Sequence, residues 1–300
     1  MLRAGCLDFL ALPVIFKCVS PSIFSQNSLF RVLLSSGYNE TAMQDLQNKV
    51  ALVTGVANKR SIAFAIAKKL KEYGVQLVLT YLPLDKDNID QKLMKLMEEL
   101  KPDLMLPLDA GDETSVKAVM AEVEQRFGKL HVLVHSIASA KRDELSGRHL
   151  DISWEGFALA QQISSYTLIS LTRAAHPLLV KEGGSVITLT YIGAERACPN
   201  YNVMGAAKAS LEANVRYLAM DLGPENIRVN GLSAGPIRTL SASGIKNFLD
   251  LLHNAEEHSP LKRNVELEEV ANTAAFLSSQ MSSGITGQTI YVDGGYNIYG

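Results

Sequence analysis

The sequence predicts a single doubly wound α/β domain built on a seven-stranded parallel sheet. Short runs rich in Val, Ile and Leu alternate with segments whose apolar residues recur at helical spacing. Several of the short runs are apolar on consecutive residues, which is typical of strands covered by helices on both faces. No internal repeat and no Pro-rich or Gly-rich linker follows residue 49, so we expect no second domain.

The alternation divides the chain into strands, helices and helix ends. Strands are expected at Val50–Thr54, Val75–Tyr81, Leu104–Leu108, Leu130–Ser136, Ser185–Tyr191, Ile227–Ser233 and Gln288–Val292. Helices are expected at Ile62–Tyr73, Leu93–Leu100, Ser115–Phe127, Trp154–Lys181, Val203–Leu222 and Leu267–Ser278. Strand–helix–strand order makes the strands parallel with right-handed crossovers. Gly74, Gly128 and Gly223 follow helical runs, where a left-handed C-cap favours glycine.

Composition excludes several classes of protein. The 300 residues include 29 basic and 31 acidic side chains, which argues against a nucleic-acid-binding face. Three scattered cysteines, Cys6, Cys18 and Cys198, exclude a disulfide scaffold and indicate a reducing compartment. No uninterrupted apolar run reaches the roughly 18 residues of a membrane-spanning helix. His253 and His258 would lie about 140° apart on a helix, so no metal is expected.

Residues 1–42 differ from the rest of the chain. They are apolar and Ser-rich, and Asp8 and Pro13 interrupt the apolar run that a signal peptide needs. Three interpretations remain open: an extension upstream of a start at Met43, a targeting segment, or a structured arm. The expected organisation is therefore an N-terminal extension over 1–42 and a dinucleotide-binding domain over 43–300.

The first predicted strand–helix turn is a candidate phosphate site. Gly55 lets the backbone turn closely beneath a ligand, and the free N–H groups at the start of the next helix favour phosphate. This is the position at which a Rossmann fold binds a dinucleotide pyrophosphate. Ser61 can add a hydroxyl donor there or act only as an N-cap. The second and third glycines of the usual fingerprint are missing.

The residues at the end of the second predicted strand do not distinguish NAD from NADP as the cofactor. It ends Thr80-Tyr81-Leu82-Pro83, with neither the acid that holds a ribose hydroxyl nor an Arg for a 2′-phosphate. Asp109, after the third strand, is placed to reach the adenine edge. Its alternative role is an Asx turn.

Tyr201 and Lys208 form the candidate catalytic pair. Seven residues on a helix turn through about 700°, which leaves the two side chains about 20° apart on one face. The small residues Gly205, Ala206, Ala207 and Ala209 would let a flat ligand approach that face. A nearby ammonium lowers a phenol's pKa, yet the phenol stays protonated at neutral pH and can stabilise a developing oxyanion. Tyr191, at a strand end, supports this interpretation over an ordinary amphipathic helix.

Residues from about 46 to 299 resemble the short-chain dehydrogenase/reductase superfamily, and within it the enoyl-[acyl-carrier-protein] reductases of bacterial type II fatty-acid synthesis. The motifs are Thr54-Gly55 with Ser61-Ile62-Ala63, His135-Ser136-Ile137, Tyr191 to Lys208, Ser233-Ala-Gly-Pro-Ile-Arg-Thr239 and Val292-Asp-Gly-Gly295. Ordinary ketoreductases of the superfamily have Tyr and Lys four apart. The wider spacing here, with a second Tyr ten residues upstream, distinguishes the enoyl reductases.

The resemblance implies that NADH delivers hydride to C3 of a trans-2-enoyl thioester, the last step of the fatty-acid elongation cycle, with Tyr201 holding the enolate. Tyr191, Tyr201 and Lys208 are then the catalytic residues. Implied cofactor contacts are Gly55, Ser61, Ile62, Leu82, Asp109, Ala110, Ile137, Lys208, Ile237, Arg238, Thr239, Leu240 and Ser241. Implied substrate contacts are Ala140, Tyr201, Met204, Ile245 and Phe248.

The resemblance also implies a substrate lid near 239–252, an acyl-carrier-protein partner, a homotetramer and a cytoplasmic location, with organelle targeting by 1–42 left open. Lys141, Arg142, Arg148 and Lys246 are the basic residues available for docking the acidic carrier. The alternative function is a carbonyl (3-oxoacyl) reductase or alcohol dehydrogenase on the same scaffold. A non-catalytic nucleotide-binding protein is a third hypothesis. His135 is expected to be a hydrogen-bonded core histidine rather than a base.

Overall fold

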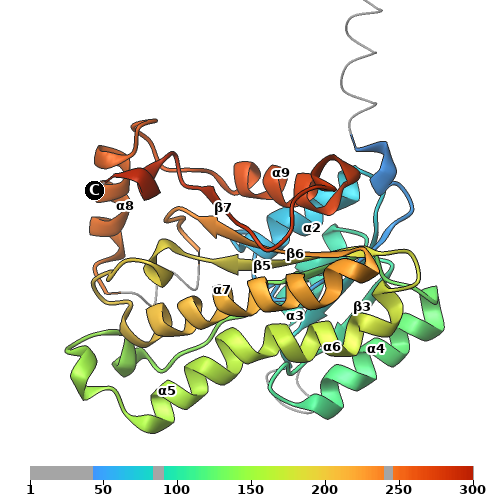
Figure 1. Cartoon of the computed structure of the whole chain (residues 1–300), viewed down its shortest axis with the longest axis horizontal. Coiled ribbons are helices and arrows are strands. Elements are labelled where there is room, and N and C mark those ends of the chain that lie inside the picture. Colours follow the sequence, from blue (N-terminus) through green and yellow to red (C-terminus); the bar gives the residue numbers. More distant parts are fainter. Residues whose placement is uncertain (1–42, 84–90, 240–245, 300) are drawn as a thin grey trace, which may run out of the picture. The chain divides into compact units, whose positions relative to one another are not determined.

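The computed structural model describes residues 43–83, 91–239 and 246–299, and seven parallel strands there form one sheet (Figure 1). The strands are β1 (Val50–Val53), β2 (Gln76–Tyr81), β3 (Leu104–Pro107), β4 (Val132–His135), β5 (Gly184–Thr190), β6 (Ile227–Ala234) and β7 (Thr289–Val292). Their order in the sheet is β3-β2-β1-β4-β5-β6-β7. The strand order reverses between β1 and β4, which confirms the doubly wound fold.

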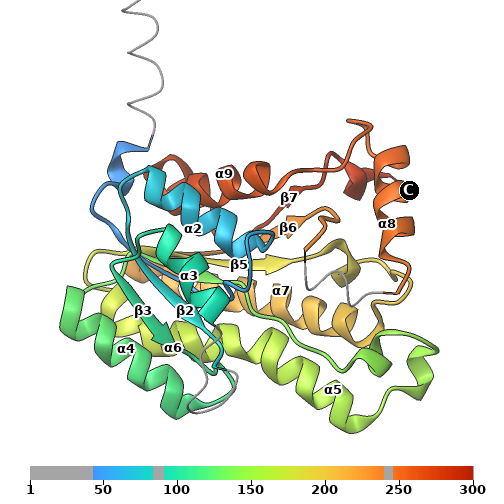
Figure 2. The same ribbon diagram turned by 180° about the vertical axis from the view of Figure 1, so that it is seen from behind.

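Helices cover both faces of the sheet, as the apolar strands require. They are α2 (Ile62–Glu72), α3 (Gln91–Glu99), α4 (Glu113–Phe127), α5 (Trp154–Gln161), α6 (Thr167–Leu179), α7 (Asn202–Leu222), α8 (Phe248–His258) and α9 (Leu267–Ser278). Alternate residues of β1 enter opposite cores: Ala51 and Val53 pack with α2 and α9, whereas Val50 and Leu52 pack with α4, α6 and α7. Figures 1 and 2 show these helices on opposite sides of the sheet. None of the helices described is long and apolar enough to cross a membrane.

Two of the three predicted glycine helix ends are confirmed. Gly74 and Gly128 take left-handed conformations, with φ of +77° and +69°. The prediction for Gly223 is wrong, because its φ is −56° and it begins a 3₁₀ turn. Pro224 occupies the start of that turn, where its fixed φ is already suitable. The chain therefore stays right-handed until Asn226, whose φ is +63°.

The single helix predicted over 154–181 is interrupted. A π-helical turn, Gln162–Tyr166, separates α5 from α6. Within it the Ser164 hydroxyl donates to the Ser139 carbonyl oxygen at 3.0 Å and accepts from the Ser139 N–H at 2.9 Å. The widened turn thus ties the helix to the loop after β4, and π-turns of this kind often mark functional sites.

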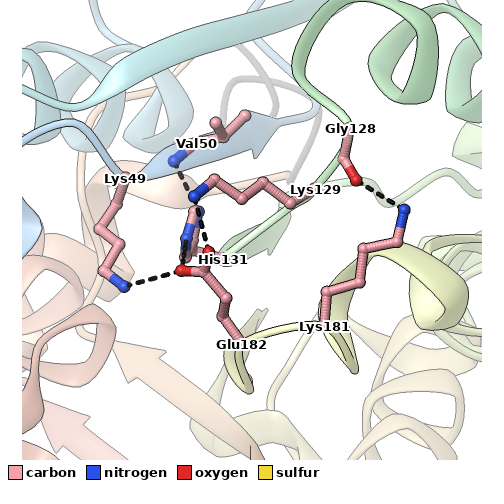
Figure 3. Close-up of polar contacts among 7 residues, drawn as sticks. All are labelled: Lys49, Val50, Gly128, Lys129, His131, Lys181 and Glu182. Atoms are coloured by element: carbon pink, nitrogen blue, oxygen red, sulfur yellow. Dashed lines mark hydrogen bonds and ion pairs between the residues drawn. The ribbon is translucent and has the colours of Figure 1, made fainter.

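A polar cluster closes the amino-terminal edge of the sheet (Figure 3). The Val50 N–H donates to His131 Nδ1 at 2.9 Å, so the neutral ring carries its proton on Nε2, which lies 2.9 Å from Glu182 Oε2. Lys129 donates to Glu182 at 2.6 Å, and Lys49 lies 3.6 Å from the same carboxylate. The ring therefore ties β1 to the segment leading into β4 at the edge opposite the candidate site.

Candidate active site

The turn after β1 lies at the point where the strand order reverses. Gly55 has a φ of +81°, and a Cβ built on it would lie 1.9 Å from the Ser136 carbonyl oxygen. The Thr54 hydroxyl donates to the Val134 carbonyl at 3.0 Å and accepts from the Ser136 N–H at 3.2 Å. Only glycine fits a turn packed this closely against the end of β4. The predicted close approach of backbone at Gly55 is confirmed.

The start of α2 is capped by Ser61. Its hydroxyl accepts from the Phe64 N–H at 3.3 Å and donates to the Asn58 carbonyl oxygen at 2.7 Å. The N-cap role of Ser61 is therefore confirmed, and its hydroxyl proton is engaged within the loop rather than offered to a ligand. The N–H groups of Ile62 and Ala63 have no acceptor among the described residues, as expected for a first helical turn. They are suited to a phosphate group.

Tyr191 and Tyr201 meet at the carboxyl end of β5. Tyr191 directly follows β5, and Tyr201 is the N-cap residue of α7 rather than a residue inside the helix. Their ring centroids are 5.0 Å apart at an interplanar angle of 65°. Gly193 lies against both rings, because a Cβ there would come within 2.5 Å of the Tyr201 ring. The two phenols that the sequence placed ten residues apart thus form one edge-to-face pair.

Gly205 serves packing within the protein rather than ligand approach. A Cβ on Gly205 would lie 2.8 Å from the Gly193 carbonyl oxygen. The absence of a Cβ at Gly205 therefore lets the loop after β5 pack against α7. The expectation that Gly205 opens space for a flat ligand is wrong, because backbone already occupies that space.

Lys208 is buried in α7 and anchored to β5. Its Nζ donates to the Leu189 carbonyl oxygen at 2.6 Å. Burial lowers the pKa of Lys208 to about 8, and the negative charge of Glu212 opposes that shift. Leu189 is the one acceptor that the described residues supply to the ammonium group, which leaves two of its N–H donors for hydroxyl groups of a ligand. This donor set fits the ribose of a nicotinamide dinucleotide.

The pKa shift predicted for the catalytic phenol is wrong in direction. Burial raises the pKa of Tyr201, with further contributions from Tyr191 and Cys198. Burial likewise raises the pKa of Tyr191. Desolvation disfavours the charged phenolate, and no opposing effect of the Lys208 ammonium contributes to the shift of Tyr201. Both phenols consequently stay protonated at neutral pH and can act as hydrogen-bond donors.

Glu212 belongs to the site although the sequence analysis missed it. Its buried carboxylate accepts from the Thr190 hydroxyl at 2.6 Å, and burial raises its pKa. Lys208 and Glu212 are one helical turn apart and hold consecutive residues at the end of β5. The four-residue spacing of Lys208 and Glu212 along one helix face is the sequence pattern that could have identified Glu212. Together they fix the strand end from which Tyr191 projects.

Two of the predicted substrate residues lie beside the phenols, and a third lines a separate cavity. Ala140 and Met204 pack in one apolar cluster with Tyr191 and Tyr201. Phe248 is half-buried and lines a cavity of about 510 Å³. Its lining residues are Arg60, Arg238, Thr239, Asn247, Phe248, Leu249 and Asp250. Ile237 packs against the core formed with α2 and α9. Leu240, Ser241 and Ile245 lie outside the described residues.

The residues predicted for the adenosine side are spread more widely. Asp109 is exposed, and its Oδ1 accepts from the Gly111 N–H at 2.9 Å, which confirms the Asx turn. Ala110 is buried, and Ile137 is partly buried against the core of α4 and α6. The Leu82 side chain is 65% exposed and contributes no charged or polar group at the tip of β2. Their roles in cofactor binding stay predictions.

His135 is confirmed as a hydrogen-bonded core residue. Its Nδ1 and Nε2 each lie 2.8 Å from a hydroxyl, those of Thr188 and Thr167. Burial, followed by the Lys208 charge, lowers the pKa of His135 to about 3. Both ring nitrogens are engaged, so the ring holds β4, β5 and α6 together.

A Gly turn at the strand-order switch, together with Tyr201 and Lys208 at the start of α7, defines a dinucleotide-binding oxidoreductase of the short-chain dehydrogenase/reductase class. The family described as enoyl-(acyl carrier protein) reductase matches residues 55–297. The chain is 52% identical to an enoyl-[acyl-carrier-protein] reductase [NADH] of Synechocystis sp., over 86% of this chain and 100% of that protein. The chain belongs to the enoyl-(acyl carrier protein) reductase family.

Two further relatives show how cofactor use varies in the family. An enoyl-[acyl-carrier-protein] reductase [NADPH] of Staphylococcus aureus is 49% identical over 85% of this chain and 99% of that protein. The crystal structure of the Anaplasma phagocytophilum reductase in complex with NAD superposes with a TM-score of 0.82. It is 41% identical and covers 87% of this chain and 97% of that chain.

Proposed function

We propose that this protein reduces the trans-2 double bond of enoyl thioesters carried on acyl carrier protein, using NADH, in the last step of the fatty-acid elongation cycle. The observation that carries the proposal is the convergence of two protonated phenols and a buried ammonium at the carboxyl end of β5. Ala140 and Met204 supply apolar surface beside them.

Each polar group has a separate role. NADH, when bound, would supply the hydride for C3 of the enoyl thioester, and a proton added at C2 would convert the resulting enolate to the saturated acyl chain. Tyr201 donates a hydrogen bond to the thioester oxygen as negative charge develops there, and Tyr191 packs against its ring and fixes its orientation. Lys208 donates to the ribose hydroxyls, and the first turn of α2 holds the pyrophosphate. A preorganised donor in a buried site stabilises an oxyanion more than the same donor does in water.

NADH is the proposed cofactor rather than NADPH. The Synechocystis relative at 52% identity is named for NADH, although the Staphylococcus aureus relative at 49% is named for NADPH. Leu82, exposed at the tip of β2, cannot pair with a 2′-phosphate.

The domain organisation, assembly and location belong to the same proposal. Residues 43–300 are the reductase domain, and 239–252 act as a substrate lid that includes the start of α8. Exposed apolar side chains on α5 and α7, those of Trp154, Tyr217 and Met220, support burial in a homotetramer. The acidic carrier docks on basic residues, for which Lys141, Arg142, Arg148 and Lys246 are the candidates. The cytoplasm, where that carrier and NADH are dissolved, is the proposed location.

The test is a turnover assay with crotonyl-acyl-carrier-protein, in which NADH oxidation is followed at 340 nm. Wild type should oxidise NADH with the enoyl substrate and not with a 3-oxoacyl thioester. Tyr201→Phe should lower kcat by about 10²- to 10³-fold, the cost of losing one oxyanion donor. The Kd for NADH should stay unchanged.

Tyr191→Phe is the matched control, because it removes a phenol from the same ring pair. It should cost less than Tyr201→Phe. Turnover with only the 3-oxoacyl substrate would establish the carbonyl reductase instead. Near-normal kcat in Tyr201→Phe would show that another group stabilises the oxyanion.

A further inference from the structure

Two unpaired arginines line the cavity beside the start of α8. Arg60 lies in the loop before α2, and Arg238 follows β6 at the same carboxyl edge of the sheet. Both side chains are exposed, and no carboxylate in the described ranges forms an ion pair with either guanidinium. The residue before Arg60 differs, because the Lys59 ammonium forms an ion pair with the Glu99 carboxylate at 2.8 Å. Arg60 and Arg238 therefore present two positive charges, neither of them in an ion pair among the described residues, to one cavity.

The loop that carries Arg60 is held in a defined turn. The Arg60 N–H donates to Asn58 Oδ1 at 2.8 Å, and the Ser61 N–H donates to the Asn58 carbonyl oxygen at 3.0 Å. Arg238 lies beside Thr239, whose N–H donates to the Ile237 carbonyl oxygen at 2.7 Å. The backbone around each arginine is therefore held by local hydrogen bonds, in the loops that follow β1 and β6.

The start of α8 adds to the positive potential of the cavity. Asn247 precedes the helix in a left-handed conformation, and no side chain of the described residues caps this end. Phe248 and Leu249 line the cavity with the uncapped first turn. Asp250 also lines it and offsets one of the two arginine charges. One net positive charge and the helix dipole remain, which favours an anion.

We propose that Arg60 and Arg238 form a phosphate-binding site that recognises a phosphate ester of a ligand in the active site, an inference that rests on the proposed function. Planar guanidinium groups bind phosphate through paired hydrogen bonds and stay charged at all physiological pH values. A cavity of about 510 Å³ is large enough for such a group. The phosphate belongs either to the 4′-phosphopantetheine arm of the thioester or to the pyrophosphate of the dinucleotide.

Two thioesters that differ by one phosphate separate these sources. Crotonyl-4′-phosphopantetheine and crotonyl-pantetheine are compared as substrates of wild type, Arg60→Gln and Lys59→Gln, and the Kd for NADH is measured for each. If the arm is the source, wild type shows a KM about tenfold lower for the phosphorylated thioester, the size of one charge-assisted hydrogen bond. Arg60→Gln brings that KM ratio close to 1 and leaves the Kd for NADH unchanged.

If the dinucleotide is the source, Arg60→Gln weakens NADH binding about tenfold and leaves the KM ratio as in wild type. Lys59→Gln removes an adjacent but already paired charge, and should match wild type in both measurements. Arg60→Gln that behaves like Lys59→Gln in both would overturn the phosphate site.

Failure of the proposed function gives a different result. Wild type would then reduce neither thioester, and the site is tested by calorimetric titration with inorganic pyrophosphate. Weaker pyrophosphate binding by Arg60→Gln than by Lys59→Gln would support the phosphate site without the reductase activity. Equal binding by the two variants would refute the site as well.

Discussion

Gly55→Ala tests whether the turn after β1 is limited by steric contact, and Gly128→Ala is its matched control. Both glycines have positive φ, +81° and +69°, so alanine at either costs about 1–2 kcal/mol of backbone strain. A Cβ at Gly55 would lie 1.9 Å from the Ser136 carbonyl oxygen, whereas a Cβ at Gly128 meets nothing within 4 Å. The contact at Gly55 must be relieved by backbone movement, which adds about 1–3 kcal/mol.

The assay is thermal unfolding of wild type and both variants at one protein concentration, followed by titration with NADH. For a domain of this size each kcal/mol lowers Tm by about 2–4 °C, so Gly55→Ala should unfold roughly 2–12 °C below Gly128→Ala. Because the displaced turn forms the candidate phosphate site, Gly55→Ala should also weaken NADH binding, while Gly128→Ala should not. Equal Tm values for the two variants would refute the steric argument.

Two further predictions concern buried basic residues. Lys208→Met should raise the Kd for NADH by about 10- to 100-fold, because a charged hydrogen-bond donor to the ribose is lost. Fluorescence titration measures this Kd, and an unchanged value would exclude the ribose contact. Burial lowers the pKa of His131 below 6.5, so the unfolded chain binds more protons between that lowered pKa and 6.5. Stability should therefore rise with pH through this window and be lost as pH falls through it. His131→Asn keeps an acceptor near the Val50 N–H but cannot titrate, so the unfolding free energy of this variant should depend less steeply on pH than that of wild type. Equal slopes of unfolding free energy against pH in the two proteins would contradict the prediction.

Much of the site could be predicted because its residues follow strand ends. Gly55 and Thr239 come shortly after predicted strands, Tyr191 is the last residue of one, and parallel strands end at one edge of the sheet. The spacing from Tyr201 to Lys208 predicted one shared helix face, whereas Tyr201 is the N-cap residue of α7 and only Lys208 lies within the helix. The π-turn between α5 and α6 could not be predicted, because it depends on hydrogen bonds between Ser164 and the distant Ser139.

The amino-acid sequence alone determined the alternation of strands and helices, the glycine turn after β1 and the seven-residue spacing of Tyr201 and Lys208, because each follows from local periodicity or backbone freedom. The tertiary structure decided the pKa directions, since desolvation depends on what packs around a group rather than on its neighbours in the chain. The rise in the pKa of Tyr201, where the sequence indicated a fall, shows this difference. Only the fold brought Arg60 and Arg238 to one cavity, because the strands that precede them end at the same edge of the sheet.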